Sequence, residues 1–159
     1  MMTNTELTPV HPNFVWVLRI RAATSALVLF GIAVVLDATA LRETGLPAGL
    51  VPAIVALLGL AFVAWLPRRR WRAWAYREGE DELDIRHGRL VRVRTVVPFA
   101  RVQHIDVSEG PVERNLGLAT LILHTAGTRA AAVPLPGLTR DEADEMRDRI
   151  RLKIRKELV

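Results

Sequence analysis

The hydrophobic and polar positions of this chain form two uncharged blocks followed by a segment of short alternating stretches. The second block, residues 46–66, contains 21 residues without a charge. At about 1.5 Å per residue, a helix of this length spans roughly 31 Å, the thickness of the hydrocarbon core of a bilayer. A soluble helix needs a polar face, which this block lacks. The pattern therefore predicts a transmembrane helix over residues 46–67.

The first uncharged block is shorter, and Arg19 and Arg21 interrupt the apolar residues that precede it. Because arginines near a helix end can extend to the lipid headgroups, we predict a first transmembrane helix over residues 14–41. The polar residues 1–13 are expected to be disordered. A cleaved signal peptide ending at the small residues 38–40 is the alternative interpretation of this block.

Positive charges lie before the first block and after the second, so both groups fall on the same side of the membrane when the two helices cross it. The connecting segment carries only Arg42, beside Glu43. Because basic residues accumulate on the cytoplasmic side, we predict a multi-pass protein of the cell membrane with both termini in the cytoplasm. The second helix runs inward whether the first is retained or cleaved. Residues 68–75 then form a basic juxtamembrane segment, whose arginines are Arg68, Arg69, Arg70 and Arg72.

From Tyr76 onward the apolar positions recur every second residue, which is typical of half-buried strands. Leu83 and Ile85 alternate with polar neighbours, and His87-Gly88 marks a turn before the next strand. Further alternating stretches predict strands over residues 91–94, 102–107, 119–125 and 129–135, the last two joined by a turn at residues 126–128.

The chain ends in a predicted amphipathic helix. Thr139 and Glu142 have the spacing of a capping box, in which a hydroxyl and a carboxylate satisfy the free N–H groups of the first turn. Ala143, Met146 and Ile150 begin an apolar stripe that Ile154 continues. Antiparallel strands followed by one such helix predict an α+β domain over residues 76–159, with a small barrel or roll closed by the helix.

The composition of the chain excludes several classes of functional site. The formal net charge of +5 comes entirely from residues 68–159, and there is no cysteine, which excludes disulfides and thiolate metal sites. The four histidines show no ligand spacing, so no metal is expected. No glycine-rich phosphate loop or Ser/His/Asp order is present, and we expect neither a cofactor nor an enzyme. Nucleic-acid binding is not expected either, since the tryptophans lie near the predicted bilayer boundary.

Four segments of the chain resemble a known family. They are residues 83–88 (LDIRHG), 97–103 (VPFARVQ), 109–119 (EGPVERNLGLA) and 136–143 (PGLTRDEA), and the resemblance extends back to about residue 18. Together with the two apolar blocks, they are similar to the bacterial pleckstrin-homology (PH)-like membrane proteins of the YdbS type. This resemblance implies a PH-like fold of about seven strands and a C-terminal helix, without a known enzymatic activity. It also implies a partner, such as a larger membrane protein with several such domains.

Two groups of residues are candidate sites. The first is a set of arginines that can contact anionic lipid headgroups, either beside the membrane helix or on the first hairpin. Topology signalling and a solvated strand face are the competing interpretations. The second is a turn motif, which either contacts a partner or stabilises a turn through a glycine at positive φ. The first group is Arg68, Arg69, Arg70, Arg72, Arg92 and Arg94; the second is Gly110, Pro111, Arg114 and Gly117.

Two functions follow as hypotheses. The first is a membrane-anchored interaction module, whose domain docks a protein partner and whose helices pack against that partner through small residues such as Ala56, Gly59 and Ala61. The second is a sensor of anionic lipid headgroups. An enzyme is a third possibility without positive support, because it requires a polar pocket with strongly perturbed pKa values.

Overall fold

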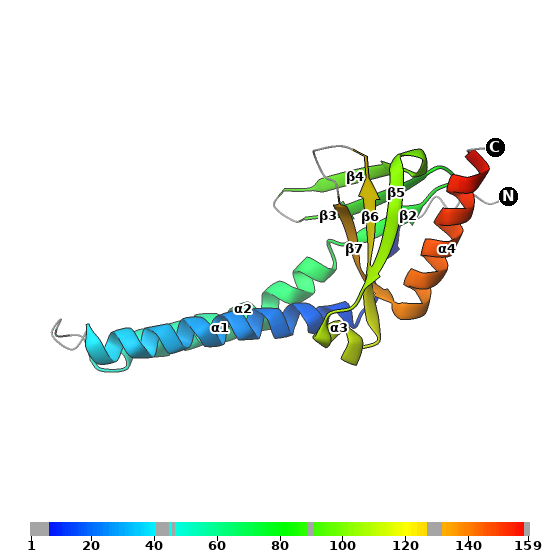
Figure 1. Cartoon of the computed structure of the whole chain (residues 1–159). Helices are drawn as coiled ribbons and strands as arrows, with labels where there is room; N and C mark the ends of the chain where they lie inside the picture. The colour runs from blue at the N-terminus through cyan, green and yellow to red at the C-terminus, as the bar shows by residue number, and fades with distance from the viewer. Residues whose placement is uncertain (1–6, 41–44, 46, 89–90, 127–131, 158–159) are drawn as a thin grey trace. The chain divides into compact units, whose positions relative to one another are not determined.

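The computed structural model describes residues 7–40, 45, 47–88, 91–126 and 132–157. The chain divides into two compact units: residues 15–69 form a helical unit, and residues 1–14 together with 70–159 form a folded unit. The folded unit therefore contains chain from both sides of the helical unit. The order of the elements can be followed along the chain in Figure 1.

The helical unit is built from α1 (Phe14–Thr39) and α2 (Leu50–Trp71). A Cβ atom added to Gly59 would lie 3.2 Å from the Cβ of Ala26, so small side chains allow the two helices to approach closely. The N–H of Gly49 donates a hydrogen bond of 2.8 Å to Asp37, which connects the end of α1 to the start of α2. Helix α2 begins later than predicted and continues past Pro67 through the arginines, which are good helix formers.

The folded unit contains two antiparallel sheets (Figure 1). The first has the order β1-β2-β3-β4 and the second the order β5-β6-β7. A 3₁₀ turn, η2 (Phe99–Arg101), connects them, and a short helix, α3 (Pro111–Asn115), lies between β5 and β6 in sequence. The strands are β1 (Thr8–Pro9), β2 (Ala75–Glu78), β3 (Glu82–His87), β4 (Val93–Pro98), β5 (Val102–Ser108), β6 (Leu118–Thr125) and β7 (Ala132–Thr139).

The predicted α+β class is confirmed, but a closed barrel is not. Among the described strands, no pairing joins the first sheet to the second. The alternation in the sequence correctly places Leu83 and Ile85 in the core, where both are almost fully buried. The predicted turn at residues 126–128 lies mostly outside the described residues.

The N-terminal segment differs from its prediction. Thr8 and Pro9 pair with Tyr76 and Ala75 of β2, so residues expected to be disordered form the edge strand β1. Val10 is only 1% exposed. The indole N–H of Trp71 donates to the backbone carbonyls of Val10 and His11, at 3.1 and 3.2 Å. Residues 7–13 are thus ordered because two backbone pairings and one buried valine attach them to the domain.

Helix α4 (Arg140–Glu157) packs against the second sheet and is also bonded to the first. Its capping box is confirmed: the N–H of Thr139 donates to Glu142 at 2.8 Å, and the N–H of Glu142 donates to the Thr139 hydroxyl at 3.2 Å. The predicted stripe faces the core, with Ala143 and Ile150 fully buried.

Glu78 of β2 is the group that bonds α4 to the first sheet. Its carboxylate accepts hydrogen bonds from Arg149 and from Lys153, each at 3.0 Å. Lys153 also donates to the carbonyl of Gly79 at 2.7 Å and lies over the ring of Phe99. One helix therefore holds the two sheets together where strand pairing does not.

Candidate functional site

The surfaces of α1 and α2 expose many large apolar side chains. Both helices are long and apolar enough to cross a membrane. Only 6% and 11% of the residues in their most apolar stretches are buried within the protein. A core helix of a soluble protein is mostly covered by its own chain, so these helices need an apolar environment from outside.

The small residues of α2 have different surroundings. Gly59 lies against Ala26 of α1 and so belongs to the contact between the two helices. Ala56 and Ala61, by contrast, are exposed. Of the three small residues named as candidate contacts, the alanines are therefore available to another helix, whereas Gly59 already serves the helix pair.

The juxtamembrane arginines lie partly within α2 rather than after it. Arg68 and Arg70 are exposed residues of its last turns, and Arg72 is exposed just beyond its end. The guanidinium of Arg69 lies 3.3 Å from the ring centre of Trp65, in a cation–π contact. Three of the four arginines are thus exposed, and the fourth is held along the helix by an aromatic side chain.

The first hairpin holds a buried carboxylate surrounded by arginines. Asp84 of β3 is fully buried, although it lies on the strand face opposite Leu83 and Ile85. Its oxygens lie 3.4 Å from Arg77, 3.1 Å from Arg86 and 2.9 Å from Arg94. Strand register explains this cluster, since Arg77 is directly opposite Asp84, and Arg86 and Arg94 are opposite each other.

These contacts determine the charge state of Asp84. Burial by itself raises the pKa of the Asp84 carboxyl, but hydrogen bonds from Arg94 and Arg86 outweigh burial, and the pKa is lowered. The same hydrogen bond raises the pKa of Arg94. Three guanidinium groups share one carboxylate, so this face retains an excess of positive charge.

Arg92 and Arg94, the two candidate arginines of the first hairpin, have different surroundings. Arg94 is bonded to Asp84. Arg92 is exposed and precedes the start of β4, beside Val91, which is 74% exposed. Among its described residues, the tip of this hairpin therefore presents the exposed Arg92 and Val91.

The turn motif forms helix α3. Pro111 occupies its first turn, where the missing N–H costs little, and Gly110 precedes it in an extended conformation. The carboxylate of Glu113, which is buried, accepts a hydrogen bond of 2.8 Å from the N–H of Gly110. Gly117 has a φ of +66°, which agrees with the structural interpretation of this glycine. The segment that follows β5 is thus a capped helical turn.

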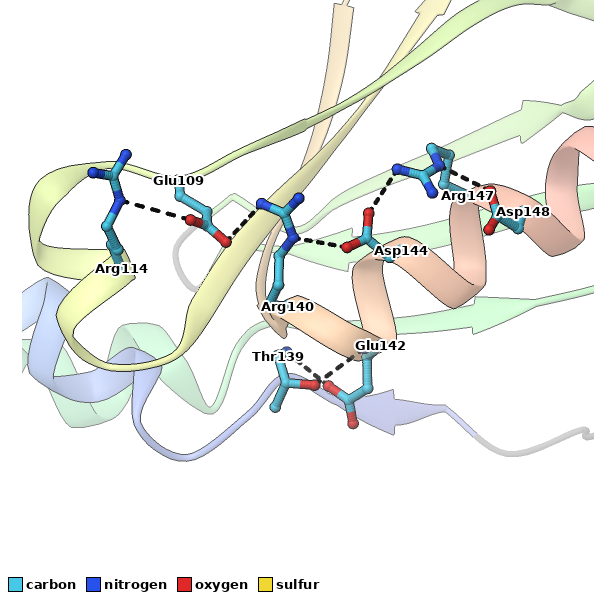
Figure 2. A network of polar contacts seen from close by, with 8 residues as sticks. All are labelled: Glu109, Arg114, Thr139, Arg140, Glu142, Asp144, Arg147 and Asp148. Atoms are coloured by element: carbon cyan, nitrogen blue, oxygen red, sulfur yellow. Dashed lines mark hydrogen bonds and ion pairs between the residues drawn. The ribbon is translucent and has the colours of Figure 1, made fainter.

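Arg114 of this motif belongs to a polar network that reaches α4 (Figure 2). Its guanidinium lies 3.8 Å from Glu109, whose other carboxylate oxygen accepts a hydrogen bond from Arg140 at 2.8 Å. Arg140 also donates a hydrogen bond of 2.7 Å to Asp144. The side chain of Arg114 is 74% exposed, so most of its guanidinium remains accessible to a partner.

The histidines differ from the prediction that they share no ligand arrangement. His104 of β5 and His124 of β6 are directly opposite each other in the register. Their rings stack with centres 4.0 Å apart, and Asp106 lies beside both. Sequence spacing alone did not show this pair, because it depends on the register between two strands separated by α3.

Comparisons with known proteins agree with the resemblance noted in the sequence. A family model described as a bacterial PH domain matches residues 20–154. The chain is 38% identical over 102 residues to the UPF0699 transmembrane protein YdbS of Bacillus subtilis (strain 168), a match covering 64% of this chain and 62% of that protein. It is 29% identical over 97 residues to the UPF0699 transmembrane protein YdbT of the same organism, covering 58% of this chain and 20% of that protein.

These matches cover less than two thirds of each relative's own length. No solved structure matches the chain significantly.

Replacing Asp84 by asparagine tests the arginine cluster. The variant keeps the shape of the side chain but removes the charge that Arg77, Arg86 and Arg94 share. We expect the folded unit to lose on the order of 1–3 kcal/mol at neutral pH, because the arginines are only partly solvated. Thermal unfolding of the full chain in detergent, followed by tryptophan fluorescence, measures this loss. The exposed Asp81→Asn variant is the control and should stay within about 0.5 kcal/mol of the unmodified protein.

The pH dependence of this effect follows from the lowered pKa. A carboxylate whose pKa is lowered by folding stabilises the protein above its unfolded pKa and loses that effect as the pH falls through its folded pKa. The difference in unfolding free energy between the unmodified protein and Asp84→Asn should therefore be fully present at neutral pH. This difference should become smaller only below the ordinary carboxyl pKa of 3.8. Equal stability of the two proteins at neutral pH contradicts the assignment.

Proposed function

The chain belongs to the bacterial PH domain family, and from this premise we propose that it is a membrane-anchored, non-catalytic interaction module. Its PH-like domain docks a protein partner at the cytoplasmic face of the cell membrane. The observation that carries this proposal is the arrangement of the folded unit, which contains chain from both ends of the helix pair. Such a unit stays on one side of the membrane while the two helices anchor it.

The position of β1 supports a hairpin topology for the anchor. Because Thr8 and Pro9 pair with β2, the segment before α1 and the segment after α2 lie in the same domain. Two helices whose outer ends meet in one domain cross the membrane as a hairpin. Arg19 and Arg21 near the start of the pair, with Arg68 and Arg70 at its end, favour the cytoplasm for that domain.

The same strand supports retention of the first helix. Cleavage at residues 38–40 removes β1 and the buried Val10 from the domain. It also removes the carbonyl acceptors of the Trp71 indole. Loss of these contacts exposes core surface, so we propose that α1 is kept in the mature protein as the first of two membrane helices.

A second membrane protein is the partner that best fits the exposed helix surfaces. Lipid covers apolar side chains, whereas exposed small residues such as Ala56 and Ala61 suit close packing against another helix. The match to one fifth of the longer YdbT shows that this type of sequence also occurs within a larger transmembrane protein. We propose that the partner is a larger membrane protein carrying related domains, as the family resemblance implies.

Purification from the native host tests this proposal. A full-length copy with a streptavidin-binding tag, extracted in a mild detergent, should retain a larger membrane protein that carries a bacterial PH domain. Ala56→Phe, which places a bulky ring on the proposed contact, should reduce recovery of that protein at least several-fold. Phe62→Trp adds bulk at an exposed position on the side of α2 away from both alanines and serves as the matched control. Recovery of the tagged protein alone under these conditions contradicts partner docking.

Anionic lipid headgroups are the alternative ligand. The observation that favours them is the excess positive charge around Asp84, together with the exposed Arg92 and Val91 at the hairpin tip. Basic residues near an anionic leaflet contribute about 1 kcal/mol each, and an exposed apolar side chain adds contact with the interface. The arginines of this surface suit the negative charge of a headgroup phosphate.

Hydrogen exchange in nanodiscs tests the alternative. With the full-length chain in discs of neutral lipid or of neutral plus anionic lipid, residues 91–96 should exchange more slowly in the anionic discs. Arg92→Ser should weaken this protection, whereas Arg151→Ser, which removes an exposed charge from α4, should not. Identical exchange in both kinds of disc contradicts headgroup binding and leaves the partner proposal unaffected.

A further inference from the structure

The second sheet carries a group of three potential metal ligands. Within the part of the chain that the structure describes, His104, Asp106 and His124 form a cluster whose ligand atoms all lie within 4.8 Å of one another. We propose that these residues bind a divalent transition-metal ion, with Zn²⁺ as the representative ion. This site is independent of the partner and lipid surfaces proposed above.

Strand geometry brings the three side chains together. His104 and Asp106 are two residues apart on β5, so both point to the same face of the sheet. His124 is opposite His104 in the antiparallel register and shares that face. The adjacent Leu123 is fully buried on the other face, which places the cluster on the side of the sheet away from the core. Rigid strands, rather than a loop, thus carry all three ligands.

The distances are close to those a metal site requires. With bonds of about 2.0–2.1 Å, two ligand atoms in a tetrahedral zinc site lie about 3.3 Å apart. In the structure, Nε2 of His124 lies 3.1 Å from Oδ2 of Asp106, and Nε2 of His104 lies 3.9 Å from the same oxygen. The Asp106 oxygen therefore lies near coordination spacing from both nitrogens.

The nitrogen of His124 supports this assignment. Its Nε2 is buried and has no hydrogen-bond partner among the described residues, and Oδ2 of Asp106 lies 3.1 Å from it. A buried polar atom without a hydrogen bond costs free energy, and coordination to a metal ion would satisfy it. The arrangement is therefore incomplete without a ligand.

One adjustment is needed before both imidazoles can bind one ion. The rings are nearly parallel, at 12°, and the lone pairs of parallel rings do not converge on one point. Rotation about the second side-chain torsion of His104 corrects this, since that torsion is broad for histidine. The side chain of His104 is 60% exposed, which leaves space for the rotation.

The ligand set indicates which ions fit. Imidazole nitrogens suit Zn²⁺, Ni²⁺ and Cu²⁺, whereas Mg²⁺ and Ca²⁺ prefer an all-oxygen shell. Two histidines and one carboxylate occupy three positions of a tetrahedron and leave the fourth to water. Since Asp106 and His104 are more than half exposed, the ion exchanges with solvent rather than forming a closed structural site.

Metal titration of the full-length protein tests the site. The protein carries a streptavidin-binding tag instead of polyhistidine, is stripped with a chelator, and is titrated with Zn²⁺ against a fluorescent competitor. We expect one Zn²⁺ per chain. His104→Gln, His124→Gln and Asp106→Asn should each weaken binding at least about 10-fold. The matched control is His11→Gln, which removes an imidazole outside the cluster and should bind as the unmodified protein does.

A second measurement keeps the test valid if a variant misfolds. X-ray absorption at the zinc edge of the unmodified, zinc-loaded protein should show a nitrogen and oxygen shell with the scattering of two imidazoles. Circular dichroism of each variant identifies any loss of fold. Absence of stoichiometric binding, equal affinity of folded cluster variants and unmodified protein, or a shell without imidazole overturns the proposal.

Discussion

The pairing of β1 with β2 is the interaction on which the rest of the structure depends. It joins residues 8–9 to residues 75–76, across the whole helical unit. Closing such a long loop has an entropic cost, which the buried Val10 and the hydrogen bonds from Trp71 offset. As a result the helix pair is an insertion between the first two strands of a domain. Both outer ends of the helix pair therefore continue directly into the domain.

Polar contacts help to hold the two sheets together, since no backbone hydrogen bonds between strands join them in the described part of the chain. Glu78 connects β2 to α4, and the network from Glu109 through Arg140 to Asp144 connects the α3 region to the same helix (Figure 2). Most of these groups are partly solvated, so each contact contributes modestly to stability. The fully buried carboxylate of Asp84 has a larger effect, because three arginines depend on it for their counter-charge.

The sequence predicts the local features well, since each depends on neighbouring residues. The uncharged blocks indicate α1 and α2, and the capping box at Thr139 marks the start of α4. The alternation at Leu83 and Ile85 shows which face of β3 is buried. Each of these patterns lies within one element, where periodicity and capping chemistry determine the outcome.

Features that depend on distant residues were not predictable in this way. β1 is too short to show a period, and its partner strand lies beyond two helices. The proximity of His104 and His124 requires knowledge of the β5–β6 register. Candidate sites built from tertiary contacts therefore become visible only in the folded structure.

The central claim is that both flanks of the helix pair belong to one domain on the cytoplasmic side. Because the chain has no cysteine, single cysteines at Leu7, Ala48 and Asp81 can be labelled with a membrane-impermeant maleimide. Positions 7 and 81 should react only in inverted vesicles, and position 48, between the helices, only in intact spheroplasts. Labelling of positions 7 and 81 from opposite sides of the membrane would contradict the account.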